Sequence, residues 1–360
     1  EKMCNLTVGK QQMCEIAKAI SHEAKVIIFD EPSAALTEAE IDELFKIIRD
    51  LRAKQLGIVY ISHRMDEIKV ITDRVSVMRD GGYIGTLITE ECTKDDIINM
   101  MVGRVIYETP KTHSMVAPDA PVVLKVEHLN AGKMVKDVSF ELHKGEILGF
   151  SGLMGAGRTE TARALFGADP KDSGDVYING EKVEIHSPKD AVAHGIGYLS
   201  EDRKRYGIVV GKSISENSTL ACLKDYVKGI FIDKKKEADI TQKYVDRLKT
   251  KTPGIDQLVV NLSGGNQQKV VVAKWLVKDC DILIFDEPTR GIDVGAKSEI
   301  YHLMNELAAE GKSIIMISSE MPEILRMSDR IIVMCEGRKT AEIDIAEATQ
   351  EKIMHAATLR

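Results

Sequence analysis

Residues 146–165 read Glu-Ile-Leu-Gly-Phe-Ser-Gly-Leu-Met-Gly-Ala-Gly-Arg-Thr-Glu-Thr-Ala-Arg-Ala-Leu. The apolar run at 146–150 predicts a buried strand, and the stretch that ends at Leu165 predicts a helix. The glycines between them and the threonine after them have the spacing of a phosphate-binding loop, although an arginine stands where lysine is usual. Small residues let backbone N–H groups surround phosphate oxygens, and the following helix adds its positive N-terminus. We expect a bound phosphate to contact six residues of this loop: Gly152, Gly155, Gly157, Arg158, Thr159 and Glu160.

The same stretch, taken alone, could also form a glycine-rich turn that binds nothing. Arg158 keeps the positive charge of lysine, but its planar guanidinium is not an equivalent replacement. The hydroxyl of Thr159 could reach a magnesium ion.

Two acidic pairs, Asp30-Glu31 and Asp286-Glu287, each end an apolar strand and precede a proline. An aspartate at a strand end can hold Mg²⁺, and the glutamate beside it can polarise the water that attacks a γ-phosphate. The alternative is that each pair merely ends its strand. The acidic pair occurs in two copies of the same sequence pattern, and a phosphate loop accompanies it. Both observations argue against that alternative.

The chain contains an internal repeat with a constant separation of 256 residues. Residues that are 256 positions apart are equivalent in the two copies, as in the pairs Leu6 and Leu262, Phe29 and Phe285, Ile61 and Ile317, and Asp73 and Asp329. Short motifs that matched by chance would not hold one register, so the two halves are homologous. Strands and helices alternate in both, which predicts an α/β fold with a mainly parallel sheet. The residues at 122–126 and 138–142 alternate with a period of two and predict an additional antiparallel sheet.

The repeat also predicts the domain organisation. The second copy begins near Pro121, so the register implies that the first copy lacks about 135 N-terminal residues. We expect three segments: the C-terminal part of a first domain at 1–103, a proline-containing linker at 104–120, and a complete second domain at 121–360.

The most specific motif is Leu262-Ser263-Gly264-Gly265-Asn266-Gln267-Gln268, which opens a predicted helix. A helix cap would explain Ser263 but not the two glycines and paired glutamines that follow. This heptad resembles the signature motif of ATP-binding-cassette (ABC) ATPases. With the phosphate loop and the Asp-Glu strand in the same order, the second copy resembles a complete ABC nucleotide-binding domain.

The stretches 286–297, 318–323 and 201–205 resemble the ATP-binding subunit of bacterial monosaccharide importers of the ribose, xylose and galactose type. The resemblance implies tandem ABC-ATPase domains of the P-loop NTPase fold, the first of them incomplete. It implies ATP and Mg²⁺ as ligands, and transmembrane permease subunits as partners. A periplasmic or lipoprotein sugar-binding protein would act through the permease, with this chain peripheral on the cytoplasmic side of the membrane. The stretches 327–330 and 348–351 resemble the ribose type most, so ribose is the favoured sugar.

In this family each ATP lies between two domains, and the resemblance implies two unequal sites. One site would use Asp30 as a metal ligand and Glu31 and His63 as catalytic residues, with Ser263, Gly264 and Gly265 opposite. Its phosphate loop would lie 256 residues before Gly152, outside the given sequence. The other would use the phosphate loop with Asp286 and Glu287. Three departures there, Val8 in the opposing signature, Arg158 and Ser319, predict nucleotide binding with weak or absent hydrolysis.

Two further residues are assigned by the resemblance alone. Asp293 matches the loop that couples the two sites, although a helix cap is its alternative interpretation. Glu201 stands where the family's glutamine loop meets magnesium and the membrane partner.

Composition limits the alternatives. The chain of 360 residues carries 49 basic and 56 acidic side chains and a net charge of −7, so we expect no nucleic-acid partner. Six scattered cysteines show no paired metal spacing. Two other functions stay open at this point: a soluble ABC ATPase that acts on ribosomes or DNA, and a fragment that cannot hydrolyse ATP.

Overall fold

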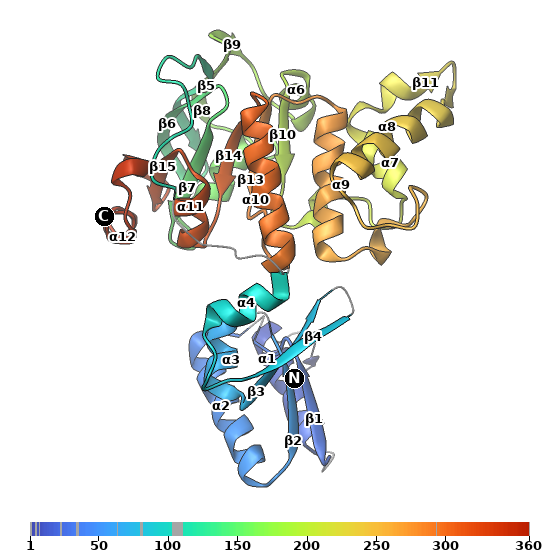
Figure 1. Ribbon diagram of the computed structural model, residues 1–360. Helices are drawn as coiled ribbons and strands as arrows, with labels where there is room; N and C mark the ends of the chain where they lie inside the picture. Colours follow the sequence, from blue (N-terminus) through green and yellow to red (C-terminus); the bar gives the residue numbers. More distant parts are fainter. Residues whose placement is uncertain are drawn as a thin grey trace. The chain divides into compact units, whose positions relative to one another are not determined.

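The computed structural model describes residues 1–360 except 1, 4, 5, 7, 22, 23, 34, 35, 63, 80, 81, 103–110, 293 and 360. The chain divides into two compact units (Figure 1). One comprises residues 1–106 with 293–295, and the other comprises 107–292 with 296–360. We describe each unit by itself.

The first unit alternates helices and strands. It contains α1 (Val8–Ser21), β1 (Val26–Asp30), α2 (Glu38–Ala53), β2 (Gly57–Ile61), α3 (Met65–Ile71), β3 (Arg74–Arg79), β4 (Gly82–Ile88) and α4 (Lys94–Val102). Strands β1 and β2 pair in parallel, and β3 and β4 pair antiparallel.

The second unit has two main sheets. Its elements are β5 (Val122–Ala131), β6 (Val135–His143), β7 (Ile147–Gly152), α5 (Arg158–Leu165), β8 (Ser173–Ile178), β9 (Glu181–Val183), α6 (Pro188–Ala193), β10 (Ile196–Leu199), η2 (Arg203–Gly207), α7 (Ile214–Thr219), η3 (Leu220–Tyr226), β11 (Val227–Lys228), β12 (Phe231–Ile232), α8 (Lys234–Arg247), η4 (Val259–Asn261), α9 (Gly264–Val277), β13 (Ile282–Asp286), α10 (Val294–Ala309), β14 (Ser313–Ile317), α11 (Met321–Met327), β15 (Arg330–Cys335), β16 (Arg338–Asp344), η5 (Ile345–Glu347) and α12 (Gln350–Ala357). The larger sheet has the order β10-β13-β14-β7-β15-β16, and its first five strands run parallel. The antiparallel sheet predicted from the period-two stretches is present, in the order β6-β5-β8-β9.

The repeat predicted from the sequence is present in the secondary structure. Moving the bounds of α1 by 256 residues gives the bounds of α9, and β1, α2, β2, α3, β3 and β4 give those of β13, α10, β14, α11, β15 and β16. The β-bulge between Val77 and Met78 also recurs between Val333 and Met334. The two halves therefore share strand register as well as motifs.

The two copies differ in how their strands are buried. All five residues of β13 and of β14 are buried, as expected for central parallel strands. In the first copy, by contrast, β1 is buried on one face only. Its Ile27 and Phe29 pack against α1 and α2, whereas Val26 and Ile28 are 57% and 65% exposed. In the described part of the first unit no element covers that second face.

The end of the predicted linker belongs to the second unit and packs on Asp329. The carboxylate of Asp329 accepts hydrogen bonds from the side chains of Lys111 and Ser114 and from the backbone N–H groups of Met115 and Ile147. Asp329 is 3% exposed, so these donors satisfy a buried charge. None of the described helices combines the length and apolar character needed to span a membrane.

Candidate functional site

The candidate site lies where neighbouring parallel strands of the second unit end. In the sheet order, β14 lies between β13 and β7. Asp286 ends β13, Ser318 and Ser319 follow β14, and the glycine-rich loop follows β7. Since carboxyl ends of parallel strands meet at one edge, the topology brings these segments together, which is the usual ligand position in open α/β sheets.

The glycine-rich loop has a backbone that only glycine adopts easily. Gly152, Gly155 and Gly157 have φ angles of 147°, 77° and 95°. A Cβ atom at Gly152 would lie 2.4 Å from the carbonyl oxygen of Met334, and one at Gly157 would lie 2.2 Å from that of Met134. Around Gly155 there is open space within 4 Å, so this part of the loop is accessible to a ligand. Helix α5 starts directly after Gly157, and Glu160 lies half-buried in its first turn.

The loop is tied to the acidic strand end by a hydrogen bond. The hydroxyl of Thr159 donates to Oδ1 of Asp286 at 3.0 Å, and Tyr198 on β10 donates to Oδ2 at 2.6 Å. Asp286 is 1% exposed, and burial raises its pKa, although both hydrogen bonds oppose the rise. The sequence analysis did not identify Tyr198, because no motif marks it. The only feature of the sequence that could have pointed to Tyr198 is its position three residues before Glu201.

The second acid, Glu287, contacts two of the three departures from the family pattern, Arg158 and Ser319. It has a φ of 49°, and its N–H donates to the carbonyl oxygen of Ile317. Ser319 donates its hydroxyl to Oε2 at 3.1 Å, and Nη2 of Arg158 lies 3.9 Å from Oε1. Burial raises the pKa of Glu287, while Arg158 and Ser319 lower it.

Arg158 itself is held inside the site. It is 8% exposed, and its Nη1 donates to the carbonyl oxygen of Ser318 at 2.6 Å. The guanidinium therefore links the phosphate loop to both the acidic strand and the segment after β14. A lysine would have to reach both partners from a single nitrogen, without the planar fork of the guanidinium.

Glu201 lies elsewhere on the same edge, after β10. Its carboxylate forms an ion pair with Arg290, which follows Asp286-Glu287-Pro288-Thr289. Glu201 is thus engaged with the loop beyond β13, and no described group of three acidic, histidine or cysteine side chains forms a ready-made metal site.

The signature heptad starts α9, away from the phosphate loop along the sheet. Ser263 is the N-cap, but its hydroxyl makes no capping bond and accepts from the side chain of Asn266. A Cβ at Gly265 would lie 2.7 Å from that of Ala296, and one at Gly264 would lie 2.7 Å from Nη2 of Arg203. The structure thus gives the two glycines a packing reason that the motif did not reveal.

The corresponding acids in the first unit lie at the end of β1. Asp30 is exposed, and Glu31 is half-buried with a φ of 47° and its N–H bonded to the carbonyl oxygen of Ile61. His63 and Asp293 lie outside the described residues, and so does the side chain of Val8.

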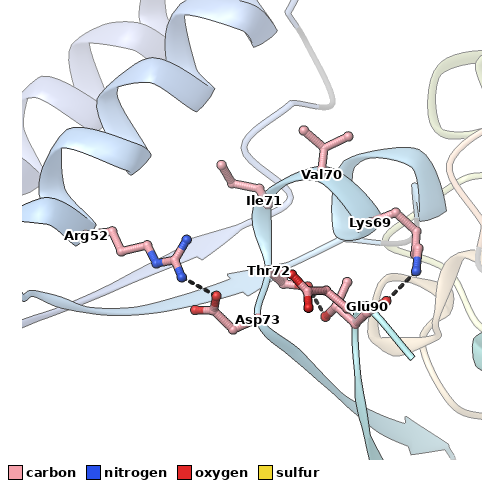
Figure 2. A pocket seen from close by; sticks show the side chains of 8 residues that line it. Arg52, Lys69, Val70, Ile71, Thr72, Asp73 and Glu90 are labelled. Atoms are coloured by element: carbon pink, nitrogen blue, oxygen red, sulfur yellow. Dashed lines mark hydrogen bonds and ion pairs between the residues drawn. The ribbon is translucent and has the colours of Figure 1, made fainter. Parts of the chain in front are cut away.

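The first unit also carries a polar pocket, shown in Figure 2. An ion pair between Arg52 and Asp73 lies on one side, and Lys69, which donates to the carbonyl oxygen of Thr89, lies on another. None of the predicted site residues is among the eight that line it. Asp73 is the repeat equivalent of Asp329, so the pocket lies where the second unit places residues 111–115.

Known proteins that resemble this chain are ATP-binding proteins of ABC transporters, which agrees with a phosphate loop beside a strand-end carboxylate. Residues 135–290 match the family model described as ABC transporter. A putative ribose/galactose/methyl galactoside import ATP-binding protein of Burkholderia lata is 59% identical over 359 residues, which cover 99% of this chain and 69% of that protein. The ribose import ATP-binding protein RbsA of Clostridium tetani is 52% identical over 98% of this chain and 70% of its own length.

Solved structures agree in fold. The ATP-binding cassette MJ1267 of an ABC transporter is 20% identical, with a TM-score of 0.57, and the match covers 65% of this chain and 98% of the cassette. The dimeric bacterial ABC transporter cassette MJ0796 is 21% identical, with a TM-score of 0.53, over 62% of this chain and 98% of the cassette. An ABC ATPase domain is an ATP-binding domain. The chain belongs to the family of sugar-import ATP-binding proteins of ABC transporters.

Proposed function

We propose that this chain energises import of a monosaccharide through a membrane permease by binding and hydrolysing ATP. Ribose is the favoured sugar, with galactose, methyl galactoside and xylose as the alternatives. The observation that carries the proposal is the hydrogen bond between Thr159 and Asp286 beneath the open loop at Gly155. It joins a phosphate loop to a strand-end carboxylate, which is the pairing that phosphoryl-transfer sites require.

The residues of the second unit divide the work of holding a nucleotide. The backbone N–H group of Gly155 and those of Gly157 to Thr159 at the N-terminus of α5 would bind the phosphates, and Arg158 supplies positive charge. Glu160 follows them in the first turn. The carboxylate of Asp286 is too deeply buried to serve as a surface acid, and its burial is better explained by a cationic ligand.

The residues present fit a magnesium ion. Mg²⁺ takes oxygen ligands in an octahedron, keeps several waters, and is bound by one or two protein oxygens together with substrate phosphates. Thr159 and Asp286 offer such oxygens 3.0 Å apart. When bound, the ion would neutralise charge on the phosphates. Asp30 is the equivalent ligand of the first unit, and Glu201 would have to leave Arg290 to contribute.

The two acidic pairs have unequal roles in this proposal. A general base must be ionised and free to accept a proton. Glu287 lies close to Arg158 and accepts from Ser319, so its oxygens already have a cation and a donor. In the first copy, His63 stands at the position that Ser319 holds in the second copy, 256 residues later. We assign hydrolysis to Glu31 and His63. Glu287 then serves mainly to hold the second nucleotide.

The signature heptad and Asp293 act on nucleotide from the other side. Ser263, Gly264 and Gly265 present the N-terminus of α9, and Ser263 is exposed without a capping bond of its own. The proposed partners are the permease and, through it, a sugar-binding protein. The proposed location is the cytoplasmic face of the membrane.

The test is a titration of this chain with Mg-ATP by calorimetry, with the Asp286→Asn variant beside it. We expect binding that depends on both Mg²⁺ and Asp286. Transport is tested in liposomes that hold the permease and the sugar-binding protein, where ribose should stimulate ATP hydrolysis and a sugar outside the four candidates should not. Absence of nucleotide binding would refute the proposal. Hydrolysis that does not depend on the sugar would refute the coupling to sugar import.

A further inference from the structure

The β11–β12 hairpin of the second unit exposes large apolar side chains. Ile230 and Phe231 are 89% and 73% exposed, and Val227 beside them is 45% exposed. The two short strands pair Val227 with Ile232 and Lys228 with Phe231, and Gly229 turns the chain with a φ of +66°. Figure 1 shows this hairpin at the end of a group of helices that includes α7 and α8. Contiguous exposed apolar side chains on a projecting hairpin mark an interaction site.

Lysines surround this apolar tip. Five lysines and only two aspartates lie between residues 220 and 236, in a chain whose net charge is −7. The five are all exposed: Lys224, Lys228, Lys234, Lys235 and Lys236. Lys234 pairs with Glu237, and Lys236 donates to the carbonyl oxygen of Asp225, which leaves three lysines without a hydrogen bond or an ion pair in this fully described stretch.

Helix stability does not explain the lysines. Three of them occupy the first turn of α8, where the helix dipole disfavours positive charge. A protein partner does not explain them well either, because lysine is depleted in protein–protein interfaces relative to the rest of the surface. An apolar tip flanked by cations is, however, the chemistry of segments that bind the interface of an anionic bilayer.

We propose that the β11–β12 hairpin inserts Ile230 and Phe231 into the surface of a membrane that contains anionic lipid. Lys224, Lys228 and Lys235 then lie against the lipid phosphates. This inference goes beyond the proposed function, and it needs neither nucleotide nor permease. Its failure is therefore distinguishable from a failure of ATP binding.

The test is sedimentation of this chain with vesicles of phosphatidylglycerol and phosphatidylcholine in equal parts, and with vesicles of phosphatidylcholine alone. We expect binding to the first and not to the second, and a decline of binding with added salt. The double variant Lys224→Gln/Lys228→Gln should bind roughly thirtyfold more weakly, because each lysine at an anionic surface contributes roughly fivefold. The double variant Ile230→Ser/Phe231→Ser should lose binding even at low salt.

Matched controls separate the hairpin from general charge and apolar exposure. Lys133→Gln/Lys189→Gln removes two exposed lysines elsewhere in the unit, and Met115→Ser removes an apolar side chain that is 78% exposed. Both controls should bind vesicles like the parent, and all variants should keep its thermal unfolding midpoint. Equal binding to both vesicle types, or full binding by the hairpin variants, would overturn the proposal. The proposal would also be overturned if the hairpin variants bound vesicles like the parent and differed from it only in oligomeric state or in binding to the permease.

Discussion

Glu31 and Glu287 have the same backbone conformation, although 256 residues separate them. Their φ angles are 47° and 49°, and the N–H of each donates at 2.9 Å to an isoleucine carbonyl oxygen at the end of the next strand, Ile61 or Ile317. A left-handed conformation is uncommon for glutamate and is retained where the surroundings impose it. The turn that presents the acid is thus the same in both units, so any difference in their activity must come from the neighbouring side chains.

The two glutamates should therefore respond unequally to the same substitution. In the transporter assembled with its permease and with a complete first domain, we expect Glu31→Gln to reduce ATP hydrolysis at least a hundredfold, because the water-activating carboxylate is lost. Glu287→Gln should reduce it only a few fold, because Arg158 and Ser319 already engage that carboxylate. Steady-state phosphate release measures both variants. Equal losses would refute the idea of one competent site.

Asp286→Asn should weaken nucleotide binding while it stabilises the nucleotide-free chain. Loss of the carboxylate should weaken Mg-ATP binding by about tenfold to a hundredfold, the range of a charged hydrogen bond. Burial raises the pKa of Asp286, so the folded state binds its proton more readily than the unfolded state. This carboxylate therefore lowers the unfolding free energy as pH rises from its ordinary range through its raised pKa.

Thermal unfolding in the absence of nucleotide checks the stability part. The midpoint of Asp286→Asn should exceed that of the parent at pH 7, and the gap should narrow in mild acid. Thr161→Ser is a suitable control. Thr161 lies on α5 like Thr159 and is buried, but its hydroxyl donates to the carbonyl oxygen of Gly157 and not to Asp286. A gap that is independent of pH would mean that Asp286 is not the titrating group.

Arg158→Lys should tighten Mg-ATP binding severalfold. The guanidinium donates to the carbonyl oxygen of Ser318 and lies beside Glu287, and some of these contacts must yield when phosphate enters. A lysine can turn its ammonium toward the phosphates at a smaller loss. Calorimetric titration measures the change, and Arg158→Ala should weaken binding, because it also leaves buried Glu287 without its cation. Tighter binding by the alanine variant would show that the positive charge does not contact phosphate.

Much of this arrangement was predictable from the sequence, because it rests on spacing. The constant separation of the repeated motifs predicted the matching strand and helix bounds, and the glycine pattern predicted the loop between β7 and α5. The contacts made by side chains without a motif could not be predicted. Tyr198 reaches Asp286 only because β10 and β13 are neighbours in the sheet, and the pairing of Glu201 with Arg290 depends on two loops that are far apart in sequence.

In the assembled transporter with a complete first domain, Gly265→Asp should suppress ATP hydrolysis through charge repulsion with phosphate at the start of α9. The structure adds a second effect, because a new Cβ would lie 2.7 Å from that of Ala296. Gly265→Ala combined with Ala296→Gly keeps the crowding low without adding charge. We expect this pair to fold like the parent and to retain most of the hydrolysis, while Gly265→Asp with Ala296→Gly stays inactive. Recovery of activity in the latter variant would mean that the glycine serves packing alone.

The exposed face of the β1–β2 sheet should make this chain self-associate. Val26 and Ile28 on β1 and Val59 and Ile61 on β2 are each between 46% and 65% exposed, and they form one contiguous apolar surface on paired strands. Apolar surface of this kind is rarely left in water, and strand edges beside it promote pairing between chains. Replacing the register partners Ile28 and Val59 by threonine keeps the β-propensity and removes much of the apolar area.

Sedimentation velocity over a range of concentrations measures the effect. The parent should shift to larger species as its concentration rises, and the Ile28→Thr/Val59→Thr variant should stay smaller over the same range. Val70→Thr is the matched control, because Val70 is 57% exposed but lies on α3, outside the sheet. It should associate like the parent. If the sheet variant associates as strongly as the control, the interface lies elsewhere, and the open face of β1 and β2 is tolerated in water.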